Sequence, residues 1–156
     1  GSGDPSFYRT FCGTPDSAPV FEALLEMKRR RIFIEVTNLI VPGGGDLKPP
    51  FLKLTDWIRD ELGAETPYHL LRFFPSYLCS DARQVPPKSM EELWGIARGE
   101  GLRHVYLGNM PGGDFENTIC PSCGSVAIER CGFEVLSMNL NGNACSRCGR
   151  ALNIVV

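Results

Sequence analysis

The stretch IFIEVTNLIVPGGGD, residues 32–46, decides the fold of this 156-residue chain. It is apolar or β-branched at nearly every position until Pro42 and three glycines end it, which is typical of a strand. An apolar run that does not alternate with polar residues predicts a strand covered on both faces, as in a parallel sheet. We therefore expect a buried parallel strand at this position.

The segments around this strand alternate between helical and extended patterns. Before it, Ser17 can cap a helix over residues 18–31, with an apolar face made by Val20, Leu24 and Met27. After it, four more elements are expected: helices at residues 49–63 and 89–101, and strands at 67–75 and 103–109. The last helix would open with a capping box of Ser89 and Glu92. Such alternation predicts right-handed crossovers and a parallel sheet, here the last part of a larger one.

A glycine-rich linker, MPGGDFEN at residues 110–117, separates this body from a cysteine-rich end. Two Cys-x-x-Cys pairs stand there, each followed directly by a glycine, and they are Cys120, Cys123, Cys145 and Cys148. Their spacing is that of a zinc ribbon, and the segment between them can form a hairpin. Four thiolates suit a tetrahedral Zn²⁺ with no coordination position left for a substrate, so the site would be structural. Iron in the same tetrahedron is the main alternative.

The composition limits the function classes. The chain has seven cysteines, an odd count, and no visible secretory signal, so a secreted disulfide framework is disfavoured and a cytoplasmic location is expected. The other cysteines, Cys12, Cys79 and Cys131, are expected to be buried or half-buried thiols. No apolar run is long enough to span a bilayer, so no membrane partner is expected. The net charge of −2 argues against nucleic acid as a partner.

Ligands of parallel α/β sheets bind at the carboxyl ends of the strands. The residues there are Thr37, Asn38, Gly43–Gly45, Arg72, Phe74, Ser76, Tyr77, Gly108 and Asn109. Arg72 stands out, because an arginine inside an apolar strand needs an anionic partner. That partner would be either a carboxylate-bearing ligand or Glu35, and the sequence leaves both open. His69 and His104 are expected to be structural.

Five segments, FYRTFCG, IEVTNLIVPG, HLLRFFPSY, GLRHVYLGN and NTICPSCG…ERCGF…CSRCG, together point to a known family. They resemble the C-terminal half of the radical S-adenosylmethionine (SAM) enzymes of the AmmeMemoRadiSam system, which are similar to pyruvate-formate-lyase-activating enzymes. The resemblance runs from about Asp4 to the last residue. It implies an α/β fold: a partial (half) TIM-type βα barrel with parallel strands over residues 3–112, followed by a small β zinc-ribbon-like four-cysteine domain over residues 113–156.

The resemblance also implies cofactors. In such enzymes a Cys-x3-Cys-x2-Cys loop binds a [4Fe–4S] cluster, which reductively cleaves SAM to a 5′-deoxyadenosyl radical. No three cysteines of this chain have that spacing. SAM and the cluster are therefore expected only in a full-length parent, and this chain alone is expected to be inactive. By position, Thr37 matches residues that contact the amino-acid part of SAM, and Arg72, Phe74 and Tyr77 match residues that line its pocket. Asn38, beside Thr37, joins them as a candidate, and many members carry His at the place of Phe74.

Three functions are compatible with these observations. The chain is expected to be the C-terminal portion of a radical SAM enzyme, which contributes SAM-side residues and a structural zinc site. The alternatives are a non-catalytic zinc-ribbon module that binds a protein or nucleic acid, and a redox- or zinc-responsive protein. The expected partner is the missing N-terminal half of the barrel. Self-association through an exposed sheet edge is the other expected contact.

Overall fold

The computed structural model describes residues 2–110 and 113–155. The chain divides into two compact units, residues 1–109 and 110–156, and each is described by itself. The glycine-rich linker predicted at residues 110–117 falls partly on residues 111 and 112, which lie outside the described residues. The described part of that linker contains a 3₁₀ turn, η3 (Asp114–Glu116).

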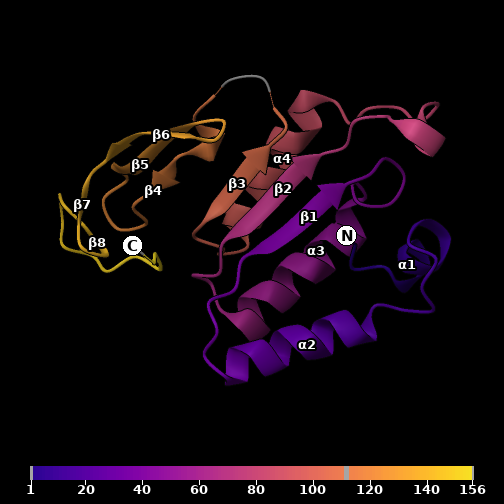
Figure 1. Ribbon diagram of the computed structural model, residues 1–156, viewed down its shortest axis with the longest axis horizontal. Helices are drawn as coiled ribbons and strands as arrows, with labels where there is room; N and C mark the ends of the chain where they lie inside the picture. Colours follow the sequence, from indigo (N-terminus) through magenta and orange to yellow (C-terminus); the bar gives the residue numbers. More distant parts are fainter. Residues whose placement is uncertain (1, 111–112, 156) are drawn as a thin grey trace. The chain divides into compact units, whose positions relative to one another are not determined.

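The first unit is built on a parallel sheet of three strands (Figure 1). Its elements in chain order are α1 (Pro5–Phe11), α2 (Ala18–Arg29), β1 (Val36–Ile40), α3 (Lys48–Trp57), the π-helical turn η1 (Ile58–Leu62), β2 (Tyr68–Arg72), the 3₁₀ turn η2 (Tyr77–Cys79), α4 (Pro87–Gly99) and β3 (Val105–Gly108). The strands pair in the order β1-β2-β3, with Thr37, His69 and Tyr106 in one cross-strand row. The three strands expected from the sequence are thus present and parallel.

The prediction of half of a TIM-type barrel is wrong. The described residues form three separate small sheets: the parallel sheet β1-β2-β3 and two antiparallel sheets in the second unit. Alternating strand and helix patterns specify parallel pairing. Closure into a barrel depends in addition on strand number, tilt and stagger, which three strands of four or five residues do not fix.

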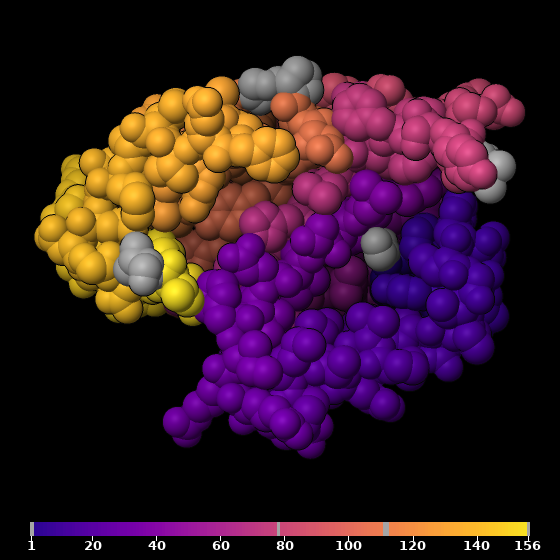
Figure 2. Space-filling view, viewed as in Figure 1, coloured from indigo at the N-terminus to yellow at the C-terminus, as the bar shows by residue number. Residues whose placement is uncertain are grey.

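The core of the first unit lies on one face of the sheet. In β1, Asn38 and Ile40 are buried, whereas Thr37 and Leu39 between them are exposed. In the space-filling view, violet atoms of the segment around β1 reach the surface (Figure 2). Successive side chains of a strand point to opposite faces, so β1 buries one face only. Within this chain the strand is therefore covered on one face only, and the prediction that it is covered on both is wrong for the chain by itself.

Helices α3 and α4 supply the other half of this core. Phe51 of α3 stacks on the fully buried Tyr68 of β2, with ring centroids 6.2 Å apart. In α4, Met90, Leu93 and Ala97 are buried, and the two helices contact each other. Helix α4 begins at Pro87, with Pro86 as the N-cap. The predicted capping box is therefore wrong, because Ser89 already lies inside the first turn.

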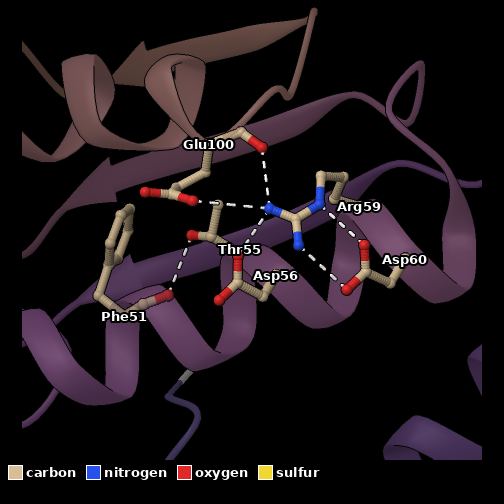
Figure 3. Close-up of polar contacts among 6 residues, drawn as sticks. All are labelled: Phe51, Thr55, Asp56, Arg59, Asp60 and Glu100. Carbon is tan, nitrogen blue, oxygen red and sulfur yellow. Dashed lines mark hydrogen bonds and ion pairs between the residues drawn. The ribbon is translucent and has the colours of Figure 1, made fainter.

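A single arginine ties η1 to the end of α4 (Figure 3). The guanidinium of Arg59 donates to the carboxylates of Asp56 and Asp60, at 2.8 Å each, and to the backbone carbonyl of Glu100 at 3.0 Å. Glu100 is the cap residue that follows α4, where a cation is favourable for the helix dipole. The hydrogen bond with Asp60, and then Asp56, raises the pKa of Arg59 above its usual range.

Helix α2 is the helix expected after Ser17, but its contacts differ from the expectation. Val20 and Met27 are 49% and 41% exposed, so the predicted apolar face is not covered. Phe21 makes the inward contact instead, at 4.5 Å between its ring centroid and that of Trp57. No helix in residues 2–110 and 113–155 combines the length and the apolar content needed to cross a bilayer.

The second unit consists of short antiparallel strands (Figure 1). They are β4 (Thr118–Ile119), β5 (Val126–Cys131), β6 (Glu134–Met138), β7 (Leu140–Asn141) and β8 (Ala144–Cys145). The hairpin expected between the two cysteine pairs is present as β5 and β6. It turns at Gly132, whose φ of 60° favours glycine.

A buried hydrogen bond links β1 to β2 on the face of the sheet that packs against the core. The side-chain amide of Asn38 donates to the phenol oxygen of Tyr68 at 2.8 Å, and both residues are at most 1% exposed. Burial raises the pKa of Tyr68, so the phenol stays protonated at neutral pH. Among the described residues, the amide oxygen of Asn38 has no hydrogen-bond partner. The phenol is therefore the partner on which the buried Asn38 side chain depends.

We predict that Tyr68→Phe destabilises the first unit. It removes the acceptor of a buried amide, which costs about 1–3 kcal/mol in the free energy of unfolding. Both tryptophans, Trp57 and Trp94, lie in this unit, so their fluorescence in a urea titration reports its unfolding. Tyr77→Phe, at a residue 88% exposed, is the matched control and should leave the midpoint unchanged. Equal midpoints for the two variants would contradict this role of Tyr68.

Candidate metal centre

The two cysteine pairs of the second unit form turns with the same backbone geometry. In the first, the amide of Gly124 donates to the carbonyl of Cys120 at 2.9 Å, and in the second that of Gly149 donates to Cys145 at 2.8 Å. Both glycines have positive φ, 69° and 74°, a backbone that glycine adopts without strain. Each Cys-x-x-Cys-Gly motif is thus a tight turn that presents two sulfurs.

The four sulfurs of the two turns converge. The Sγ atoms of Cys120, Cys123, Cys145 and Cys148 all lie within 4.8 Å of one another. The sulfurs of Cys120 and Cys148 are 3.6 Å apart, and those of Cys123 and Cys145 are 3.8 Å apart. A tetrahedron with metal–sulfur bonds of about 2.3 Å has edges of about 3.8 Å. The cluster can therefore hold a metal ion such as zinc, and the four predicted ligands are the residues that converge.

The cluster also forms the centre of the small core of the second unit. Cys120 and Cys145 are each 1% exposed and pack with the buried Ala127 and Leu152. Cys123, Leu140 and Ile154 lie against this group. With so few apolar residues, metal binding energy would supply much of the folding energy of the unit.

Hydrogen bonds favour the thiolate form at two of the four sulfurs, those of Cys123 and Cys145. The hydroxyl of Ser125, followed by its backbone N–H, lowers the pKa of the Cys123 thiol. The same hydroxyl, followed by the backbone N–H of Cys148, lowers the pKa of Cys145 to about 6. At Cys148 the backbone N–H of Arg150 lowers the pKa, but burial and the neighbouring cysteine sulfurs outweigh it and raise the pKa to about 12. Since the thiolate is the metal-binding form of cysteine, the contacts of Ser125 prepare Cys123 and Cys145 for a cation. Ser125 was not singled out from the sequence, although it directly follows the first Cys-x-x-Cys-Gly motif.

Comparison with known proteins gives one long match. The chain is 39% identical over 156 residues to an uncharacterized protein of Methanocaldococcus jannaschii, MJ0808. The match covers 99% of this chain but 46% of the relative, so the chain spans about half the length of the curated protein it matches. No protein-family model matches the chain.

Thr37 and Asn38 are the second and third residues of β1, level with His69 and Leu70 of β2. The prediction that they lie at the carboxyl end of the strand is therefore wrong. Thr37 is exposed on one face of the sheet, whereas its neighbour Asn38 is buried on the other. The amides of Gly44 and Gly45 both donate to the carbonyl of Val41, so these glycines close their own turn. Thr37 and Asn38 therefore face different surroundings and do not form one surface.

Arg72 is 9% exposed and bonded to the loop that precedes α4. Its Nε donates to the carbonyl of Val85 at 2.7 Å and its Nη2 to Gln84 at 3.0 Å. Its guanidinium also lies over the ring of Phe74, 5.2 Å from the centroid. Glu35, the suggested internal partner, contacts Nε2 of His69 instead, at 2.8 Å. Arg72 therefore finds its partners in a loop carbonyl and a glutamine side chain.

Two residues after β2 and β3 have unusual backbones. Tyr77 has a φ of 48° and is 88% exposed. Asn109 has a φ of 59°, and its side-chain amide donates to the carbonyl of Arg72 at 3.1 Å. Phe74 is 47% exposed. The loops after β2 and β3 therefore carry two exposed aromatic rings, Phe74 and Tyr77, and two residues with positive φ, Tyr77 and Asn109.

His104 is buried, whereas the three cysteines outside the metal cluster are exposed. His104 is 3% exposed, and burial lowers its pKa although Glu65 lies 3.1 Å away and acts in the opposite direction. This environment fits the structural role expected for His104. Cys12, Cys79 and Cys131 are exposed, so the prediction that they are buried or half-buried is wrong.

We predict that the isolated chain binds close to one metal ion and that Cys145→Ser abolishes this binding. The second unit should then lose the protection of its β5–β6 amides from hydrogen exchange, while tryptophan fluorescence of the first unit stays unchanged. Cys131→Ser, which removes an exposed cysteine of the same unit, is the matched control and should keep the metal. A metal content that does not depend on Cys145 would contradict the assignment.

Proposed function

We propose that this chain is the C-terminal portion of a radical SAM enzyme and that a structural zinc ion holds its second unit together. The observation that carries the zinc assignment is the set of four cysteine sulfurs within 4.8 Å. All four coordination positions of a tetrahedral ion are filled by thiolates, so no position remains for substrate. Zinc is favoured over iron because structural four-cysteine sites with paired Cys-x-x-Cys turns are typical zinc sites.

Two observations support the radical SAM part of the proposal. The resemblance of the five sequence segments extends over both units and includes the cysteine pairs. The relative from Methanocaldococcus jannaschii has roughly twice the length of the region it shares with this chain. In the proposal, the other half of a longer protein carries the cluster-binding cysteines, and this chain supplies strands and loops beside SAM.

The proposed SAM residues fall into two groups. Thr37, Phe74 and Tyr77 are exposed and would contact the cofactor directly. Asn38 and Arg72 are buried and bonded to protein groups, so they would act by holding the sheet and the loop after β2 in place. The contact of the Arg72 guanidinium with the ring of Phe74 is an example of such support.

The proposed partner is the N-terminal half of the longer protein. The exposed Thr37 and Leu39 lie on the face of β1 that the core does not bury, and parallel sheets are normally covered on both faces. Covering by a second copy of the chain is the competing arrangement. Both would bury the same strand, but only the first would complete a SAM site.

A second candidate function is a zinc-stabilised module that binds another protein. Strand β6 is an edge strand, and Val135, Leu136 and Met138 on it are more than half exposed, as is Phe133 in the preceding turn. Exposed apolar edges are places where another chain can add a strand. This observation favours a protein partner over nucleic acid.

Anaerobic reconstitution with iron and sulfide tests the radical SAM proposal. We predict that this chain takes up no [4Fe–4S] cluster, because none of its cysteines has the Cys-x3-Cys-x2-Cys spacing. A protein that joins this chain to its cluster-binding half should form one cluster and release 5′-deoxyadenosine from SAM. Zinc content is measured in the same samples, so the zinc assignment is tested separately. A longer protein with zinc but without SAM cleavage would overturn the enzyme proposal and favour the binding module.

A further inference from the structure

The two cysteine turns have the same backbone, but different side chains follow them. In the first turn the amide of Cys120 donates to the carbonyl of Ser125 at 2.8 Å, and in the second the amide of Cys145 donates to that of Arg150 at 2.9 Å. Ser125 and Arg150 therefore occupy equivalent positions, each directly after the glycine of its motif. The two turns thus differ at this position by a hydroxyl in the first and a guanidinium in the second.

The hydroxyl of Ser125 lies between sulfurs of the two different turns. Its Oγ is 3.1 Å from the Sγ of Cys123, in its own turn, and 3.4 Å from the Sγ of Cys145, in the other turn. The backbone of Ser125 is fixed by the hydrogen bond that its carbonyl accepts from Cys120. The side chain is half-buried, so the hydroxyl is held against the sulfur cluster.

We propose that Ser125 is a positioning residue of the metal site, whose hydroxyl donates one three-centre hydrogen bond shared between the thiolates of Cys123 and Cys145. The inference rests on the proposed zinc function. Four thiolates around Zn²⁺ carry a net charge of −2, and a hydrogen bond that withdraws charge from two of them reduces their mutual repulsion. Because the two sulfurs belong to different turns, the same bond fixes the distance between the turns. Contacts of this kind to metal ligands contribute to metal affinity as well as to orientation.

The sharpest test uses two side chains of the same shape. Ser125→Thr keeps the hydroxyl, and Ser125→Val replaces it with a methyl group. We expect the zinc affinity of Ser125→Val, measured by competition with a chromophoric chelator, to fall by about 10-fold or more, the usual range for outer contacts of metal ligands. Ser125→Thr, which keeps the hydroxyl, should bind zinc with an affinity close to that of the wild type. Ser122→Ala, at the exposed serine of the same turn, is the matched control.

A spectroscopic readout separates this role from a general loss of stability. In Co²⁺-substituted protein, the sulfur-to-metal charge-transfer bands should move to longer wavelength in Ser125→Val and Ser125→Ala, because their thiolates lose a hydrogen bond. Those of Ser125→Thr should match wild type. Equal zinc affinities and equal spectra for the Thr and Val variants would overturn the role of Ser125 while leaving the zinc site intact. A wild-type chain that retains no zinc would overturn both this inference and the zinc assignment.

Discussion

The second unit depends on one constraint, which is that four cysteine sulfurs must share a space less than 5 Å across. All lie within 4.8 Å of one another, and two of them, with Ala127 and Leu152, form most of the buried core. Without a cation, thiolates at these distances would repel one another, so deprotonation of the cluster and metal binding are linked. The two glycine turns bring these four atoms together, and the hydroxyl of Ser125 contacts one sulfur from each turn.

The sequence predicts local features of the fold well and distant ones poorly. The strands around Val36, Tyr68 and Val105 are found where apolar runs place them, and they are parallel. Barrel closure was predicted wrongly, because it depends on how many strands assemble and how they are staggered. The burial of only one face of β1 was also missed, since an apolar run does not reveal which of its faces another element covers.

The metal site could be predicted from local sequence, whereas the contacts of the proposed SAM residues could not. The four cysteines are two local motifs, and their spacing alone identifies them as ligands of one site. The partners of Arg72 and Glu35 could not be predicted, because they come from other segments of the chain. Val85 and Gln84 accept hydrogen bonds from the arginine, and His69 contacts the glutamate. Ser125 lies between these cases. Its place after the first motif is local, but its contact with Cys145, twenty residues further along, appears only when the turns meet.

X-ray absorption spectroscopy at the zinc edge tests the central claim most directly, because it measures the atoms bound to the metal. For the chain purified with its zinc, we predict a single shell of four sulfurs at about 2.3 Å, the usual zinc–thiolate distance. A shell that contains nitrogen or oxygen at about 2.0 Å would show that at least one of Cys120, Cys123, Cys145 and Cys148 is not a ligand. That result would contradict the closed structural site on which this account of the second unit depends.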